Sequence, residues 1–246
     1  MENSPHDFSI CIAGIVIRIH TLYTRTFWIC QNYLCERNPD FEVTITDQDL
    51  VEEQKATYGK SDNFLGGYLE PTAVYRKIIE RAIDDFDIMI MHGAAIAVGN
   101  EGYIFSGRSG VGKTTHIQKW VDQAPNCYVI NGDKPIIRYM NHSFYVCGTP
   151  WSGKEHIDTN AIVPLKGIAF MTRDESNSLT LMDFVHAFPR IMNQLYIYKE
   201  PYKMQRLLNI VDKMNEQIRF YNFLSNNLKD DSYQVSYDAL INSNFS

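Results

Sequence analysis

Hydrophobic positions follow two patterns in the first third of the chain, one typical of strands and the other of a helix. Up to about residue 46 the apolar runs are short and rich in Ile and Val, and the last of them alternates apolar with polar residues, which is typical of strands. Pro71 suits the first turn of a helix, and apolar residues then recur at helical spacing to about Asp85. The expected strands cover residues 8–20 (bent at Ala13–Gly14), 26–30 and 41–46, and residues 63–69 are expected to be a Gly-Gly-broken connection.

From residue 88 onward short strands dominate, and a helical pattern replaces them near residue 181. Two apolar runs separated by Gly-Asn-Glu-Gly predict an antiparallel hairpin, at residues 94–98 and 103–106. Further strands are expected at 88–91, 127–130, 135–140, 143–147, 162–171 and 221–224, and helices at 114–122, 184–195, 202–214 and 235–241. The pattern predicts an α/β protein in three parts: an N-terminal mostly-β module (1–86), a core (87–175) and a C-terminal helical segment (176–246).

The hairpin leads directly into the segment that carries the strongest chemical signal. Residues 107–115, Gly-Arg-Ser-Gly-Val-Gly-Lys-Thr-Thr, fit G-x-x-x-x-G-K-[ST], a loop whose backbone N–H groups hold phosphates. Lys113 would reach the β- and γ-phosphates, and the Thr114 hydroxyl would ligate Mg²⁺. The alternative is a glycine-rich turn that binds nothing. The predicted nucleotide-binding residues are Gly107, Ser109, Gly110, Val111, Gly112, Lys113, Thr114 and Thr115.

An acidic residue follows the next apolar strand. Residues 127–130 end in Asn131-Gly132-Asp133, which places a carboxylate about twenty residues after Lys113, where a Walker-B acid is expected. Asp133 is predicted to hold Mg²⁺ with Thr114, or to accept the proton of an attacking hydroxyl. The alternative is a turn aspartate, which is common in such sequences.

Two further segments contain candidate side chains. His92 precedes the hairpin and is as compatible with a structural histidine as with a group beside the phosphates. Residues 148–156, Gly-Thr-Pro-Trp-Ser-Gly-Lys-Glu-His, form a loop rich in functional groups. There we expect Glu155 to act as a base or metal ligand, and Trp151 and Lys154 to contact the substrate. The predicted catalytic residues are Lys113, Asp133, His92 and Glu155.

Several other polar residues are expected to be structural. His156 is assigned to a solvated turn, and Arg108 is expected to point outward from the glycine-rich loop. Arg190 and Arg206 lie in the helical segment, where we expect solvated side chains, with a folded-back phosphate contact as the alternative.

Composition and charge narrow the class of protein. The chain has 246 residues with 45% hydrophobic and 21% charged residues, an ordinary globular composition. A formal net charge of −6 argues against a nucleic-acid surface, and no apolar run is long enough to span a membrane. The five cysteines form no C-x-x-C pair, which favours a reducing cytoplasmic setting over a zinc or redox site. The first seven residues lack the basic run of a signal peptide.

Together these motifs resemble one superfamily. His92-Gly93, the hairpin, the glycine-rich loop and Ile130-Asn-Gly-Asp133 are similar to HPr serine kinases and phosphoenolpyruvate carboxykinases. The block Gly148–Glu155 followed by Val163-Pro-Leu-Lys166 resembles a branch of small HPr-kinase-like proteins, some encoded beside peptide-modifying systems. The resemblance covers residues 88–172. HPr kinases carry two consecutive aspartates where this chain has Gly132-Asp133, and the carboxykinase metal-binding histidine and substrate arginines are not identifiable.

The resemblance implies a P-loop core of that type and an ATP- and Mg²⁺-dependent kinase. Its acceptor would be a serine-like hydroxyl on a peptide or a small compound. Ring-forming relatives imply a possible homo-oligomer. A nucleotide-binding regulatory or assembly protein without phosphotransfer is the alternative that Gly132 favours, and a carboxykinase-like enzyme acting on a small organic acid is a third.

Overall fold

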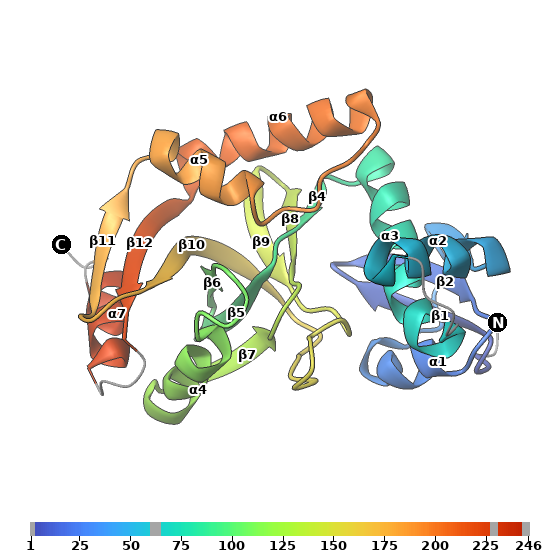
Figure 1. Cartoon of the computed structure of the whole chain (residues 1–246), viewed down its shortest axis with the longest axis horizontal. Helices are drawn as coiled ribbons and strands as arrows, with labels where there is room; N and C mark the ends of the chain where they lie inside the picture. The colour runs from blue at the N-terminus through green and yellow to red at the C-terminus, as the bar shows by residue number, and fades with distance from the viewer. Residues whose placement is uncertain (1–2, 60–64, 227–230, 243–246) are drawn as a thin grey trace.

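Two β-sheets and seven α-helices make up the described part of the chain, which covers residues 3–59, 65–226 and 231–242 of a computed structural model (Figure 1). The fold is mixed α/β. The smaller sheet has the order β1-β2-β3, and the larger one follows the path β4-β8-β9-β10-β6-β5-β7, with β12 and then β11 branching from β10. No helix among the described residues is long and apolar enough to cross a membrane.

The smaller sheet begins with a hairpin rather than one bent strand. Its two strands, β1 (Asp7–Ile12) and β2 (Ile15–His20), are joined by a turn in which Ala13 and Gly14 both have positive φ. The parallel strand β3 (Phe41–Thr44) completes the sheet. Alternate residues of β1 and β2 are fully buried, so this hairpin contributes one face of a core.

Three helices accompany this sheet, where the sequence predicted only one. They are α1 (Arg25–Ile29), α2 (Asp47–Tyr58) and α3 (Gly66–Asp85), with a 3₁₀ turn at η1 (Gln31–Tyr33). The strand predicted at residues 26–30 is therefore wrong: this segment is helical, and the buried Glu70 carboxylate accepts hydrogen bonds from Leu22 N, Tyr23 N and Thr26 Oγ1 just before and within it. Helix α3 also starts five residues before Pro71. Residues 63–64 of the predicted connection lie outside the described part.

The larger sheet is built around β10 (Ile162–Arg173). This strand pairs with β9 (Ser143–Cys147) at its start, and further along with β6 (Glu101–Ser106) and β12 (Arg219–Ser225). The hairpin predicted from the sequence is present as β5 (Gly93–Val98) with β6, and the strands predicted at residues 135–140 and 143–147 pair as a second hairpin, β8 (Ile136–Met140) with β9. The remaining strands are β4 (Ile88–Ile90), β7 (Cys127–Asn131) and β11 (Ser178–Met182).

The C-terminal segment is not simply helical, because it supplies two strands to the larger sheet. β12 lies parallel to β10, and β11 lies antiparallel to β12. Its helices are α5 (Phe184–Met192), α6 (Pro201–Gln217) and α7 (Ser232–Leu240). Helices α5 and α6 lie along one side of the sheet, while α7 and α4 (Lys113–Gln123) lie along the other (Figure 1).

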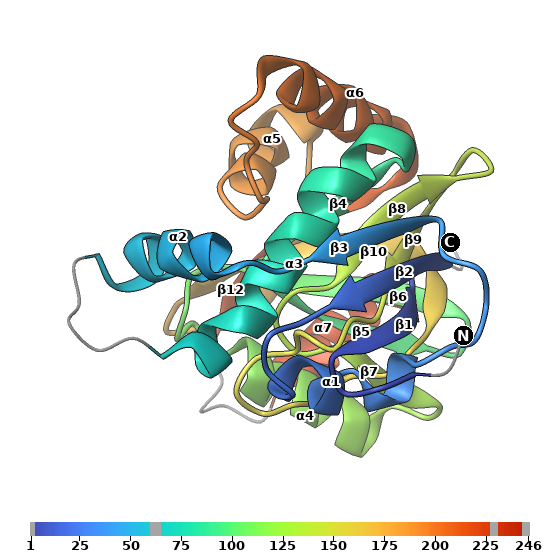
Figure 2. The same ribbon diagram turned by 90° about the vertical axis from the view of Figure 1, so that its right-hand side faces the viewer.

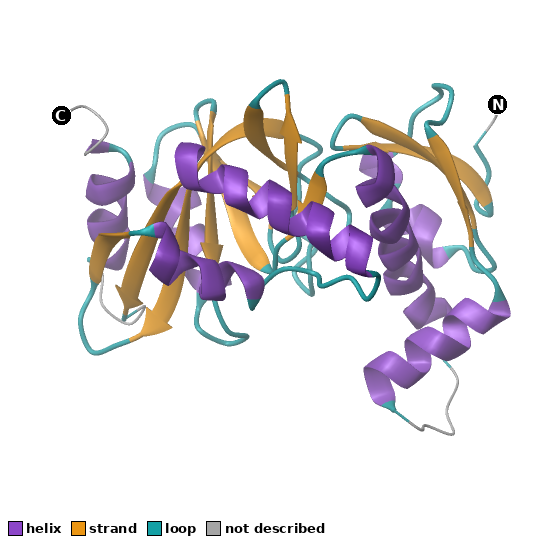
Figure 3. Ribbon diagram, turned by 90° about the horizontal axis from the view of Figure 1, so that it is seen from above, coloured by secondary structure: helices purple, strands orange, loops and turns teal. Residues whose placement is uncertain are grey.

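Helix α3 joins the two sheets. It lies between the smaller sheet and the rest of the protein (Figures 2 and 3), and its buried Val74, Ile78 and Ile79 belong to one apolar cluster that contains residues of both sheets. A second, smaller cluster fills the space between the larger sheet and the helices α4 and α7. The strand β6 and the helix α4, which flank the loop at residues 107–112, are thus both anchored in the core.

Candidate functional site

The glycine-rich loop connects the end of β6 to the start of α4. Gly107, Gly110 and Gly112 all have positive φ (152°, 77° and 106°), which glycine adopts at little cost. At Gly107 a Cβ atom would lie 2.7 Å from the carbonyl oxygen of Met171, so a side chain there would collide with β10. The sequence of this loop is therefore matched to a tight backbone that ends at a helix N-terminus, where unpaired N–H groups favour anions.

Lys113 is the first residue of α4 and is buried. Its Nζ donates hydrogen bonds to the carbonyl oxygens of Gly107 (2.9 Å) and Arg108 (3.3 Å). Burial lowers the pKa of the Lys113 ammonium, and the negative charge of Asp133 partly opposes that shift. Two of the three ammonium N–H groups thus fix the side chain inside the loop, which leaves a third donor for a ligand.

A cavity of about 560 Å³ lies over the helix start. It brings together every predicted catalytic residue, although they come from four different segments. Its walls are formed by His92, Ser109, Gly110, Gly112, Lys113, Thr114, Thr115, Gly132, Asp133, Ser152, Gly153, Lys154 and Glu155. Of the predicted nucleotide-binding residues, only Gly107 and Val111 face elsewhere, into a second cavity.

Asp133 is positioned by a residue that the sequence analysis did not single out. The side chain of Asn131 is fully buried, and its Oδ1 accepts hydrogen bonds from the backbone N–H groups of Asp133 (2.9 Å) and Lys134 (2.6 Å). Its Nδ2 donates to the Thr149 carbonyl oxygen at 2.8 Å. An asparagine that precedes a glycine at a strand end is a turn-forming signal, and it could have been recognised from the sequence.

The Asp133 carboxylate lies between two nitrogen donors. Its Oδ1 is 3.4 Å from His92 Nε2, and its Oδ2 is 2.7 Å from Lys134 Nζ. Burial alone would raise the pKa of Asp133, but the hydrogen bonds and charges of His92 and Lys134 outweigh burial and hold the pKa well below its usual range. The other ring nitrogen of His92, Nδ1, is 3.1 Å from Gln194 Oε1. Asp133 is therefore a fixed negative charge facing the glycine-rich loop.

Gly132 is constrained by the neighbouring loop. A Cβ atom at this position would lie 2.9 Å from the Ser152 carbonyl oxygen and 3.4 Å from that of Ile157. The Gly132 N–H group also donates to the Ile157 carbonyl oxygen at 3.0 Å. An aspartate here would require the loop at residues 152–157 to move.

Trp151 does not offer a surface to a substrate, contrary to the expectation from the sequence. It is only 8% exposed, its ring stacks on Tyr75 of α3 with 4.3 Å between ring centroids, and its Nε1 donates to the Pro71 carbonyl oxygen. The aromatic side chain is thus used to attach the loop to α3. Lys154 and Glu155, by contrast, are exposed at the edge of the cavity.

The remaining polar candidates occupy separate places. His156 lines a different cavity, beside Trp28 and Asp158, and Arg206 pairs with Asp87 at 3.0 Å. Arg108 and Arg190 both line the second cavity that Gly107 and Val111 face. Nothing in the sequence places these two arginines together.

The cavity offers oxygen atoms that could ligate a metal ion, but the described residues do not form a complete metal-binding site. In the described part of the chain, no three His, Cys, Asp or Glu residues form a metal-binding group. The Thr114 hydroxyl and the Asp133 carboxylate face the same cavity. Mg²⁺ is commonly bound by one or two carboxylates together with substrate phosphates, so this donor set fits a magnesium–nucleotide complex better than a free ion.

Comparisons with known proteins give only a remote relationship. No protein-family profile matches the sequence, and no curated protein matches it significantly. Among solved structures, the HPr(Ser) kinase/phosphatase from Coxiella burnetii is similar over 63% of this chain and 93% of that chain, with 7% sequence identity and a TM-score of 0.40. The chain therefore has a distant structural similarity to a kinase/phosphatase, and no sequence family is identified.

Proposed function

We propose that this protein is an ATP- and Mg²⁺-dependent kinase that transfers phosphate to a hydroxyl group of a peptide or a small acceptor. One observation supports this proposal above the others: a single cavity is lined by the glycine-rich loop, by Lys113 and Thr114, and by a negatively charged Asp133. Phosphoryl transfer depends mainly on positioning and charge neutralisation, and these residues can provide both.

Each residue of the cavity has a role in this proposal. The loop N–H groups and Lys113 would hold the β- and γ-phosphates, while Thr114 and Asp133 would hold the magnesium ion, which neutralises phosphate charge. The acceptor oxygen would form the new P–O bond as the bond to the ADP oxygen breaks, and the hydroxyl proton would pass to Asp133 or to solvent. His92 would orient Asp133, and Glu155 offers a second carboxylate.

The part of the cavity lined by Lys154 and Glu155 suits an acceptor rather than the nucleotide. Lys154 and Glu155 are exposed on a loop that lines the same cavity as the helix start. All five cysteines are unpaired, which supports the cytoplasmic setting, where ATP is abundant.

A nucleotide-binding regulatory protein is the second candidate, and Gly132 favours it. The contact with the Ser152 carbonyl oxygen disfavours an aspartate at this position, where HPr kinases carry the first of two. Under this alternative the protein binds Mg–ATP tightly and transfers phosphate to nothing.

Binding and transfer should be measured separately. The affinity for Mg–ATP is measured by calorimetry for the wild type, Lys113→Met and Asp133→Asn. The control is Lys166→Met, which replaces an exposed lysine on β10. Lys113→Met should weaken binding at least ~100-fold, because buried phosphates lose a charged partner. Asp133→Asn should bind within about threefold of the wild type, yet transfer phosphate at least ~100-fold more slowly.

Phosphotransfer is followed by mass spectrometry, with ATP and a panel of serine peptides and small hydroxy compounds. A product formed by the wild type and Lys166→Met, but not by Asp133→Asn, would support the kinase. Tight Mg–ATP binding with no product from any acceptor would favour the regulatory alternative. Unchanged Mg–ATP affinity in Lys113→Met would remove the loop from the site.

A further inference from the structure

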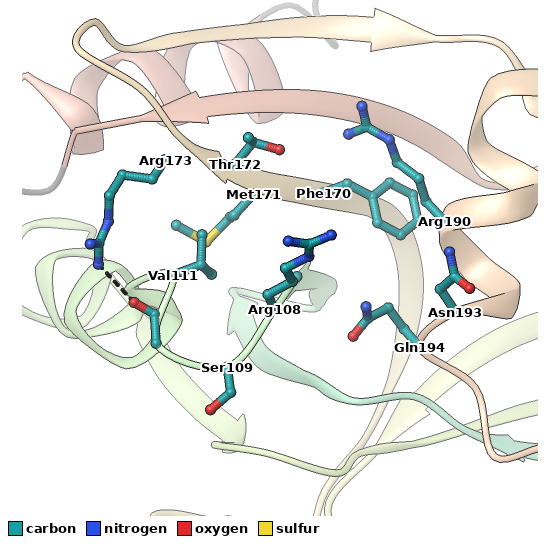
Figure 4. A pocket seen from close by; sticks show the side chains of 12 residues that line it. Arg108, Ser109, Val111, Phe170, Met171, Thr172, Arg173, Arg190, Asn193 and Gln194 are labelled. Carbon is teal, nitrogen blue, oxygen red and sulfur yellow. Dashed lines mark hydrogen bonds between the residues drawn. The ribbon is translucent and has the colours of Figure 1, made fainter.

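Three arginines from distant parts of the chain line a cavity of about 690 Å³ beside the glycine-rich loop (Figure 4). Arg108 belongs to the loop, Arg173 ends β10, and Arg190 is on α5. Figure 4 shows the Arg108 guanidinium reaching into the cavity toward Phe170. The other walls are formed by Gly107, Ser109, Gly110, Val111, Phe170, Met171, Thr172, Asn193 and Gln194, with no acidic residue among them.

The positive charges of these arginines are not neutralised by the described part of the chain. Arg173 donates to the Gly110 carbonyl oxygen and Arg190 to Asn222 Oδ1, both at 2.8 Å, and these acceptors are neutral. None of the three arginines takes part in an ion pair there. In a chain with net charge −6, such a hollow favours an anion over a cation, because guanidinium groups match carboxylate and phosphate geometry.

The arginine cavity is connected to the proposed phosphate-transfer site. Ser109 and Gly110 line both cavities. Gln194 lines the arginine cavity, and its Oε1 lies 3.1 Å from Nδ1 of His92, whose Nε2 faces Asp133. The arginine cavity therefore shares part of the glycine-rich loop with the proposed transfer site, and its Gln194 contacts the histidine that faces Asp133.

We propose that this cavity binds a carboxylate or phosphate group of the acceptor, so that the substrate carries both a hydroxyl and an anionic group. This inference rests on the proposed kinase function and defines its substrate class. The nucleotide phosphates have a separate cradle, since Lys113, Thr114 and Thr115 line only the other cavity. The apolar ring of Phe170 offers contact to the carbon part of such an acceptor.

Anion binding is tested directly with inorganic phosphate, in protein saturated with Mg²⁺ and a non-hydrolysable ATP analogue. Arg108→Gln and Arg190→Gln are compared with Arg81→Gln, an arginine on α3 paired with Asp85. Each cavity variant should bind phosphate about tenfold more weakly than the wild type, and Arg81→Gln should not differ. The Arg108 guanidinium has no partner among the described residues, so its replacement is not expected to disturb folding. The proposal fails if phosphate binds equally to all variants, or if the cavity variants lose affinity for the ATP analogue as strongly as for phosphate.

Acceptor pairs then identify the source of the anion. One pair is a serine-ending peptide with a free C-terminal carboxylate or a C-terminal amide, and the other is glycerol 3-phosphate or glycerol. The charged member of one pair should have the higher kcat/KM, and Arg190→Gln should reduce that preference about tenfold. Equal kcat/KM within both pairs would overturn the inference while leaving the kinase proposal standing. Phosphate binding that depends on the arginines, without transfer to any acceptor, would reject the kinase and keep the anion site.

Discussion

Gly132 illustrates how the geometry of one residue limits the chemistry of the site. A Cβ atom on Gly132 would lie 2.9 Å from the Ser152 carbonyl oxygen and 3.4 Å from that of Ile157, and the loop between these residues carries Lys154 and Glu155. A side chain at this position is therefore disfavoured by the packing of this loop, and the neighbouring carboxylate of Asp133 is the charge that faces Lys113.

Gly132→Ala should lower the free energy of unfolding by about 1–3 kcal/mol, because the new methyl group presses on backbone atoms that cannot rotate away. The control is Gly67→Ala on α3, where a Cβ atom would meet only the Tyr23 ring at 3.3 Å. A helical glycine replaced by alanine should be neutral or slightly stabilising. Urea denaturation of both variants provides the measurement, and equal stability of Gly132→Ala and the wild type would show that the loop moves freely.

At the scale of elements, α4 is fixed to the sheet and to α7 by a histidine. The His116 ring lies between Phe105 and Phe223, with centroid distances of 4.7 and 4.8 Å. Its Nε2 lies 3.1 Å from both Trp120 Nε1 and the Ser236 hydroxyl. Since the indole N–H can only donate, the ring accepts there as the neutral form. Burial, with a smaller effect of Lys119, lowers the pKa of His116 to about 3.

This pKa predicts an acid-sensitive helix. Unfolded chains take up a proton at His116 near pH 6.5, while the folded protein does not until about pH 3. The free energy of unfolding should therefore fall as pH drops through that window, by about 2 kcal/mol at pH 5. His116→Phe should flatten this part of the stability profile, whereas His142→Asn, at an exposed turn, should not. Thermal unfolding between pH 4 and 7.5 is the measurement, and parallel profiles for the wild type and His116→Phe would contradict it.

Elements whose signal is local were predicted from the sequence, and those fixed by distant partners were not. The hairpin before residue 107 and the strand before Asp133 depend on neighbouring residues, and both occur as predicted. Helix α1 depends on Glu70, more than forty residues away. The capping box of α2, Thr46 with Asp49, is a local signal that also predicts a helix start. Arg190 lines its cavity because β12 pairs with β10 and α5 packs on β12, and the spacing of hydrophobic residues does not predict such long-range pairing.

At the scale of the whole molecule, the N-terminal part supports the rim of the candidate site. Trp151 attaches the 148–158 segment to α3, and the Tyr33 hydroxyl donates to Asp158 Oδ1 at 2.8 Å. The loop that carries Lys154 and Glu155 is therefore held at both of its ends by contacts that span the two sheets. Sequence reasoning identified this loop but assigned its tryptophan to the wrong surface.

Trp151→Ala should reduce the free energy of unfolding by about 3–5 kcal/mol, as expected for a large buried ring. Trp151→Phe keeps the stack on Tyr75 and loses the indole hydrogen bond, so its cost should be about 1 kcal/mol. Trp28→Ala is the matched control, since that ring is 62% exposed and should change stability by less than about 0.5 kcal/mol. Chemical denaturation measures all three, and a neutral Trp151→Ala would restore the ring to the list of substrate contacts.

The placement of β12 inside the larger sheet has a kinetic consequence. This strand pairs with β10 over residues more than fifty positions earlier in the chain, and with β11 on its other side. During synthesis, the edge of β10 that pairs with β12 stays unpaired until residue 225 has left the ribosome. Unpaired strand edges readily pair with other chains. We expect refolding in milliseconds to seconds, as for other topologies dominated by distant pairings, and aggregation of nascent fragments that stop before β12.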